Sequence, residues 1–188
     1  MKKILPLFAI ALLCGCMSSP KRAPSLWTID FSDARDFARV ESPKAGVARM
    51  LAVSVCEPYD GEGLAVLRSD GSIAFDPYNR FAAAPAALVK GFVHEALAKS
   101  GLFERVVGAN SVAAAPWAVE VTVRELALDC RTEGSRRARV ELEIAVIHGR
   151  EVQSTGRGSG DYPAGNGNYS AAFSKAMNAA VAAAVKEL

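Results

Sequence analysis

The sequence lacks an excess of either charge: its 188 residues carry 22 Lys and Arg against 20 Asp and Glu. Proteins that bind nucleic acid usually cluster a surplus of Lys and Arg on one face, where these side chains neutralise phosphates. The balance of charge therefore argues against a broad basic surface, and we expect no nucleic-acid partner.

Residues that commonly bind metals or carry catalysis are also scarce. Neither histidine, His94 or His148, has a Cys, Asp or Glu at the spacing of a metal site. The glycine-rich stretch 156–160 lacks the lysine and the following helix of a phosphate-binding loop. No serine has glycines two residues before and two residues after it, as a nucleophile elbow requires. We therefore expect no catalytic site, no metal and no cofactor.

Long apolar runs are missing too, since a membrane-spanning helix needs about 20 apolar residues. The run Ile4–Leu13 is about half that length and is interrupted by Pro6. It follows two lysines, Lys2 and Lys3, and precedes small residues. This order is typical of a secretory signal peptide.

The end of that run, Leu13-Cys14-Gly15-Cys16, resembles the lipobox of bacterial lipoproteins. A lipobox has an apolar residue three positions before the modified cysteine and a small residue directly before it. Cys16 meets both conditions, whereas Cys14 directly follows the large Leu13. We predict a signal peptide over residues 1–15, lipidation of Cys16 and a tether over residues 16–25. The alternative is a simple cleaved signal with two incidental cysteines.

Lipidation would anchor the protein to a membrane without spanning it, because more than one acyl chain holds a protein stably at a bilayer. Residue 17 is Met and not Asp, as in lipoproteins that move to the outer membrane of two-membrane bacteria. We therefore expect a location in the cell envelope, at the periplasmic face of the outer membrane.

Besides the predicted lipidation site Cys16, two cysteines, Cys56 and Cys130, remain after the signal is removed, in an oxidising compartment. Each lies near the end of a predicted strand, so the two could form a disulfide. Two separate buried thiols are the alternative. The sequence does not place the two strands side by side, and both readings stay open.

The remaining chain predicts strands and helices in the order strands, helix, strands, helix. Pro85 suits the first turn of a helix, Gly101 suits the left-handed residue that ends it, and Asp70-Gly71 marks a tight hairpin turn. The other expected elements are strands at 26–31, 50–55, 64–68, 73–75, 104–107, 117–130 and 137–148, a weak strand at 152–159, and a closing helix at 170–188. This pattern predicts one α+β domain over residues 26–188, with two amphipathic helices packed on one face of a mainly antiparallel sheet.

The strand 117–130 contains a break in its alternation. Trp117 to Val123 place apolar side chains at odd positions, whereas Leu126 to Cys130 place them at even positions. A strand can change parity only where an extra residue is inserted. We therefore predict a β-bulge near Arg124-Glu125.

The stretch Phe75–Val107 resembles the signature region of the ABC-type transport auxiliary lipoproteins, the PqiC-like family that accompanies MCE-domain proteins in lipid transport. The matching segments, in order, are Asp76–Phe81, Leu88–Leu97 and Ser100–Phe103. Members of that family more often open with a Tyr-x-Leu strand, where this chain has Leu26-Trp27-Thr28. The resemblance implies a docking component of a system with an inner-membrane permease, an ATPase and a periplasmic MCE-domain protein, without catalysis by this chain.

Alternatives to that function remain. One is a stand-alone envelope lipoprotein that binds a lipid or glycan, or assists assembly of an outer-membrane complex; another is a periplasmic enzyme. Self-association into a homo-oligomer is also open. Within Asp76–Phe81, the residues Tyr78, Arg80 and Phe81 are candidate partner contacts, since Tyr and Arg often dominate binding. A structural role is the competing hypothesis, with Phe81 packing at the helix start and Tyr78 covering the edge of the core.

Overall fold

The structure is a computed structural model that describes residues 23–188 except 36, 42 and 166. The predicted signal peptide and the predicted lipidation site Cys16 lie outside the described residues. The elements along the chain are β1 (Ser25–Trp27), α1 (Ser32–Arg35), β2 (Lys44–Val55), β3 (Gly63–Arg68), β4 (Ile73–Phe81), α2 (Pro85–Ser100), β5 (Phe103–Val107), β6 (Trp117–Cys130), β7 (Arg137–His148), β8 (Glu151–Pro163) and α3 (Tyr169–Lys186).

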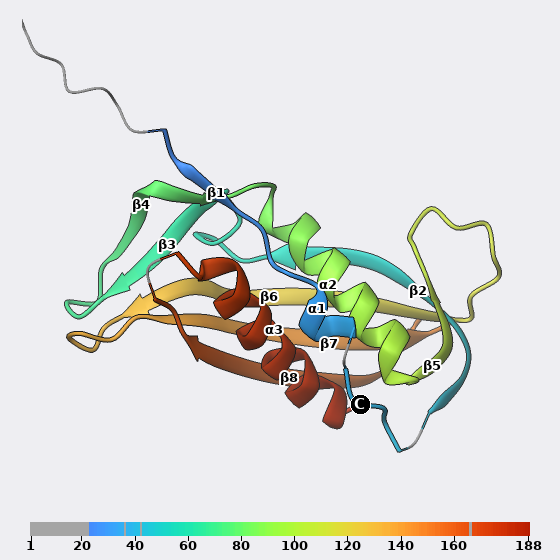
Figure 1. Cartoon of the computed structure of the whole chain (residues 1–188). Helices are drawn as coiled ribbons and strands as arrows, with labels where there is room; N and C mark the ends of the chain where they lie inside the picture. The colour runs from blue at the N-terminus through green and yellow to red at the C-terminus, as the bar shows by residue number, and fades with distance from the viewer. Residues whose placement is uncertain (1–22, 36, 42, 166) are drawn as a thin grey trace, which may run out of the picture.

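One eight-stranded sheet with helices on one face makes up the fold (Figure 1), and this confirms the predicted α+β class. The long antiparallel ladders join β6 to β7 and β7 to β8. On its other edge β6 pairs in parallel with β2 along its first half and with β3 near its end. Beyond these strands, β5 pairs with β2, β4 with β3, and β1 with β4. We call the side of the sheet that faces away from the helices the helix-free face.

The chain leaves the edge of β6 between β2 and β3. Val55 pairs with Val123, and Val66 pairs with Leu128. The chain therefore advances eleven residues from Val55 to Val66 while β6 advances only five, and the extra residues leave the edge of the sheet. Tyr59, from the extra residues, packs on Ala65, Leu67 and Ala127. This small apolar cluster is separate from the main core, and it lies on the helix-free face because Leu64 and Val66 of the same strand face the helices.

The predicted β-bulge is present in β6. The register with β7 shifts between Val123 and Glu125, so Val123 and Leu126 both reach the core although their parities differ. The partner strand β7 has no such shift over this stretch and buries every second residue from Ala138 to Val146. The bulge therefore keeps one apolar face against the helices along the full length of β6.

The last strand, β8, differs from its prediction. Residues 160–163 were expected in a loop, but β8 continues through Pro163 and pairs with β7 along its length. Its glycines Gly156, Gly158 and Gly160 are buried beneath α3. A Cβ atom at each would lie closer than 3.0 Å to the carbonyl oxygens of Ala184, Ala180 and Ala176, respectively. The glycines therefore let the backbone of α3 lie directly on β8, and this explains a glycine-rich stretch that is not a phosphate loop.

The segment before β2 was predicted less well. The chain leaves the sheet after Trp27, so the first strand is shorter than the expected 26–31, and the short helix α1 lies where a loop was expected. Phe31 then packs against α2, where a Cβ at Gly91 would lie 2.6 Å from the Cζ atom of its ring. Gly91 therefore makes room for this N-terminal segment on the surface of α2.

Replacing Gly158 with Ala tests the contact between β8 and α3. Since neither backbone can move away without breaking the sheet or the helix, we expect Gly158→Ala to lower the free energy of unfolding by about 3 kcal/mol or more. Urea denaturation measures the change. Ser159→Ala, the exposed neighbour in the same strand, is the control, and equal stability of Gly158→Ala and the control would contradict the contact.

Candidate functional site

The candidate partner segment Asp76–Phe81 forms the end of β4 and not a separate turn. Phe75 pairs with Ala65 and Arg80 pairs with Gly63, so β4 carries several extra residues between these two pairs. The Asp76 carboxylate closes the bulge by accepting hydrogen bonds from the backbone N–H of Tyr78 at 2.8 Å and of Asn79 at 3.1 Å. The bulge therefore has a defined shape, held by its own side chains.

The three candidate contact residues have different environments. Phe81 is 3% exposed and packs edge-to-face on Phe173 of α3, with ring centroids 5.4 Å apart. It belongs to the core, so its assignment as a partner contact is wrong. Its burial agrees with a structural role, and its ring contact is with α3. Tyr78 is 54% exposed and does not cover the core edge. Arg80 is exposed as well, which leaves Tyr78 and Arg80 as candidates for contact.

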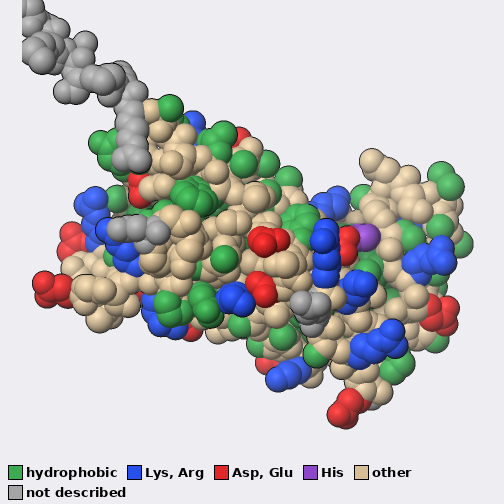
Figure 2. Space-filling view, in the orientation of Figure 1, with side chains coloured by type: hydrophobic (Ala, Val, Ile, Leu, Met, Phe, Trp, Pro, Cys, Tyr) green, Lys and Arg blue, Asp and Glu red, His purple; other side chains and the backbone are tan. Residues whose placement is uncertain are grey.

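Further apolar side chains lie exposed around Tyr78. Leu26 is 63% exposed, Phe75 53% and Ile73 41%. We call Leu26, Ile73, Phe75 and Tyr78 the β1–β4 patch. Figure 2, which views the molecule from the helix side, shows further hydrophobic side chains at this end, near the point where the described chain begins. The sequence contained a signal for the patch, because Ile73 and Phe75 alternate with Ala74 and so place the larger side chains on the face away from the core.

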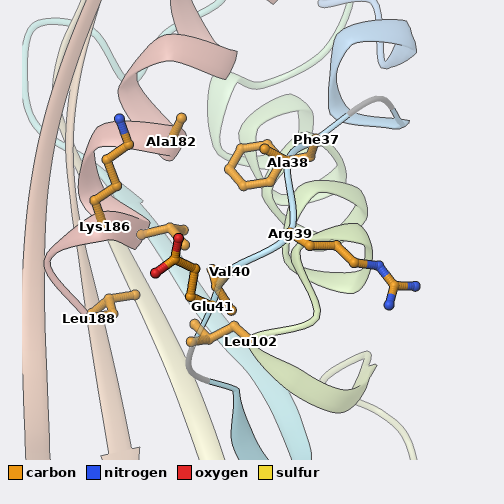
Figure 3. Close-up of a pocket in the computed structure, with 10 residues that line it drawn as sticks. Phe37, Ala38, Arg39, Val40, Glu41, Leu102, Ala182, Lys186 and Leu188 are labelled. Carbon is orange, nitrogen blue, oxygen red and sulfur yellow. The ribbon is translucent and has the colours of Figure 1, made fainter.

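A groove lies at the other end of α3, between the helix and residues 37–41 (Figure 3). Its volume is about 390 Å³, and its apolar lining comes from Phe37, Val40, Leu102, Ala182, Val185 and Leu188. Lys186 and Glu41 stand at the groove, whereas Arg39 points away from it. Sequence reasoning missed this site, because its lining residues come from three distant segments and none belongs to a motif.

Arginines near the turn between β6 and β7 are paired with acids. Arg131 lies 2.6 Å from Asp129, and Arg137 pairs with Asp161 across the β7–β8 ladder. The hydrogen bond from the Arg131 guanidinium lowers the pKa of the Asp129 carboxyl. These local ion pairs lie on an exposed loop and strand surface.

The helix-free face carries a second set of ion pairs on adjacent strands. Glu143 of β7 accepts hydrogen bonds from Arg124 of β6 at 2.9 Å and from Arg157 of β8 at 2.7 Å. These two guanidinium groups lower the pKa of the Glu143 carboxyl. The charged pairs join neighbouring strands on a face that water reaches.

The two cysteines of the domain are both free thiols. The backbone N–H of Cys56 bonds to the carbonyl of Val123, whereas Cys130 lies at the far end of β6 beside Arg68. Six to seven strand residues, roughly 20 Å, separate these positions, while a disulfide needs Cα atoms within about 7 Å. The disulfide left open by the sequence is therefore not formed, and burial raises the pKa of the Cys130 thiol.

The described residues contain no group of three His, Cys, Asp or Glu side chains that could hold a metal ion. The ring of His148 packs at a tilt on Trp117, with ring centroids 4.5 Å apart, and His94 is half-buried in α2. Within the same part of the chain, no helix has the length and apolar character needed to cross a membrane.

No family model matches the chain, and no curated protein matches it. Among solved structures, protein XCC0632 from Xanthomonas campestris, described as a DUF330 protein, aligns with a TM-score of 0.59 at 17% identity over 85% of this chain and 86% of that chain. A crystal structure of an uncharacterized protein gives a TM-score of 0.59 at 13% identity, over 84% and 90% of the two chains. PelC from Paraburkholderia phytofirmans, a dodecamer, gives 0.43 at 10% identity, over 77% and 87%. The likeness to the first two is one of fold.

Truncation of two aromatic residues separates the core role from the surface role in β4. Phe81→Ala should lower the free energy of unfolding by about 3–5 kcal/mol, because it leaves a cavity against Phe173. Tyr78→Ala should change it by no more than about 0.5 kcal/mol, because the side chain is exposed. Thermal unfolding followed by circular dichroism measures both variants. A loss of stability in Tyr78→Ala as large as that in Phe81→Ala would show that Tyr78 is structural.

Acid should weaken the fold through Glu143. Because the folded-state pKa of this carboxyl lies below its ordinary value of 4.5, its contribution is present at neutral pH and is lost as the pH falls through the folded pKa. Between about pH 5 and pH 3, wild type should therefore lose more stability than Glu143→Gln. Denaturant midpoints measured across this range check the prediction. Glu133→Gln, which removes an exposed carboxylate from the β6–β7 turn, is the control and should lose as much stability over this pH range as wild type does.

Proposed function

We propose that this chain is the lipid-anchored, periplasm-facing auxiliary lipoprotein of an ABC/MCE-type lipid-transport system, and that it acts by docking without catalysis. One observation carries the proposal: the segments Asp76–Phe81, Leu88–Leu97 and Ser100–Phe103 resemble, in this order, the signature region of the auxiliary lipoproteins. These segments fold as consecutive parts of one unit, namely the end of β4, helix α2 and the start of β5. Gly101, with φ of 68°, ends α2 within that unit.

The tether determines how such a protein would work. Six residues separate Cys16 from Ala23, where the described chain begins. At about 3.5 Å per residue, they hold the domain within roughly 25 Å of the acylated cysteine. The domain therefore stays at one membrane, at the outer membrane by the proposal, and presents its surface to the periplasmic MCE-domain protein. Lipid passes between the components, and the ATPase that works with the permease supplies the energy.

A second function is favoured by the groove at the end of α3. Its volume of about 390 Å³ and its apolar lining fit an acyl chain, and Lys186 can attract an anionic head group. This favours a stand-alone envelope lipoprotein that binds a lipid. Mass spectrometry of lipids that stay bound to the purified protein would distinguish this function from docking alone.

The anchor is tested by Cys16→Ser. We expect the variant to lose metabolic labelling with a fatty acid and to leave the membrane fraction, because Cys16 alone satisfies the lipobox. Cys56→Ser, in the folded domain, is the matched control and should be labelled as wild type is. Continued acyl labelling of Cys16→Ser would exclude the assignment.

The partner is tested by capture of the lipidated protein from its own membranes after crosslinking. We expect the MCE-domain protein of the transport system in the captured material, and its absence under conditions that preserve known envelope complexes would oppose the docking function. The size of the complex, measured by light scattering, also tests whether the chain forms a homo-oligomer.

A further inference from the structure

We propose that the β1–β4 patch rests on the surface of the lipid bilayer that holds the Cys16 acyl chains. The inference rests on the proposed lipidation of Cys16 and adds an orientation: the domain sits on its anchoring membrane by a defined corner instead of moving freely on its tether. Leu26, Ile73, Phe75 and Tyr78 would enter the boundary between head groups and acyl chains.

The larger apolar side chains of the patch share the helix-free face. Phe75 pairs with Ala65, which belongs to the apolar cluster on that face, and Ile73 pairs with Leu67 of the same cluster. The Phe75 ring lies over Gly63, where a Cβ would come within 3.0 Å of its Cδ1 atom. The ring is thus supported from beneath by the strand and is presented outward.

Leu26 joins the same face through β1. It pairs in parallel register with Arg80, and Arg80 pairs with Gly63, so these three residues project from one side of the sheet. The neighbouring Trp27 projects to the other side, where its ring packs on Tyr169 of α3. In this strand of three residues Trp27 is half-buried against the core, whereas Leu26 is 63% exposed and presents its side chain to a surface outside the domain.

The length of the tether identifies that surface. Leu26 lies ten residues after Cys16, and the six residues of tether before Ala23 span at most roughly 25 Å. Val112 is fully exposed and precedes the start of β6. In the register of β3 with β6, Gly63 lies level with a residue about eight positions after that start, which is roughly 26 Å along the strand. Of these two apolar surfaces, the β1–β4 patch is the one that the anchor keeps close to the bilayer.

Charge also fits a membrane that carries anionic lipids. Arg80 is exposed beside Leu26, and Lys21 and Arg22 precede the patch in the sequence. The nearby Asp76 carboxylate is engaged by the backbone N–H groups of β4. Apolar side chains with basic residues beside them are the combination by which peripheral proteins bind anionic bilayer surfaces.

The test uses a chain of residues 17–188 without the lipid, because all strands and helices and the whole buried core of the described structure lie within residues 25–188. Vesicles of phosphatidylethanolamine and phosphatidylglycerol are mixed with this chain and floated. The double variant Leu26→Ser with Phe75→Ser should partition about tenfold more weakly than wild type, since it removes two apolar side chains from the contact. The matched control, Val112→Ser with Val152→Ser, removes two exposed apolar side chains elsewhere and should partition as wild type does.

Three results would overturn the proposal: no flotation of the wild-type chain, equal flotation of wild type and the Leu26/Phe75 variant, or an equal loss in the control. A change of sedimentation coefficient in the Leu26/Phe75 variant with unchanged flotation would assign the patch to a second copy of the chain instead. Acyl labelling of Cys16 and capture of the MCE-domain protein are measured separately. A failure of the proposed function therefore appears in those assays, whereas a failure of the membrane contact appears in flotation.

Discussion

The direct contact between the backbone of α3 and strand β8 organises much of this domain. Three glycines on one face of β8 lie under helix carbonyl groups, where any Cβ atom would collide. Four of the buried positions of the helix are alanines, Ala172, Ala176, Ala180 and Ala184, so the two backbones can approach closely. Glycine costs conformational entropy in a strand, and here the burial of a whole helix face offsets that cost.

The two faces of the sheet are stabilised in different ways. The helix side is a continuous apolar core, which the bulge in β6 keeps in register across both halves of that strand. The helix-free side is held by cross-strand ion pairs such as those of Glu143, and by the small cluster under Tyr59. Exposed ion pairs contribute little each, so the core carries most of the stability and the charges keep this face wet.

The two surface features with functional interest lie at opposite ends of α3. The start of the helix, at Tyr169, packs on Trp27 beside the β1–β4 patch, and its last residues line the apolar groove with Phe37. With the patch at the anchoring membrane, the groove would face away from it.

Local residue patterns predicted the α+β class, the limits of α2, the hairpin turn at Gly71 and the bulge in β6, because alternation, helix-ending glycines and parity depend on neighbours in the sequence. They also yielded the lipobox hypothesis at Cys16, which lies outside the described residues. Tertiary structure alone decided which strands pair beyond the hairpins, that Phe81 is core while Tyr78 is exposed, and that Cys56 and Cys130 lie too far apart to bond. These features depend on contacts between distant segments. A single sequence fixes the face of each strand through its period of two, but it does not say which other strand lies at its edge or which helix covers it.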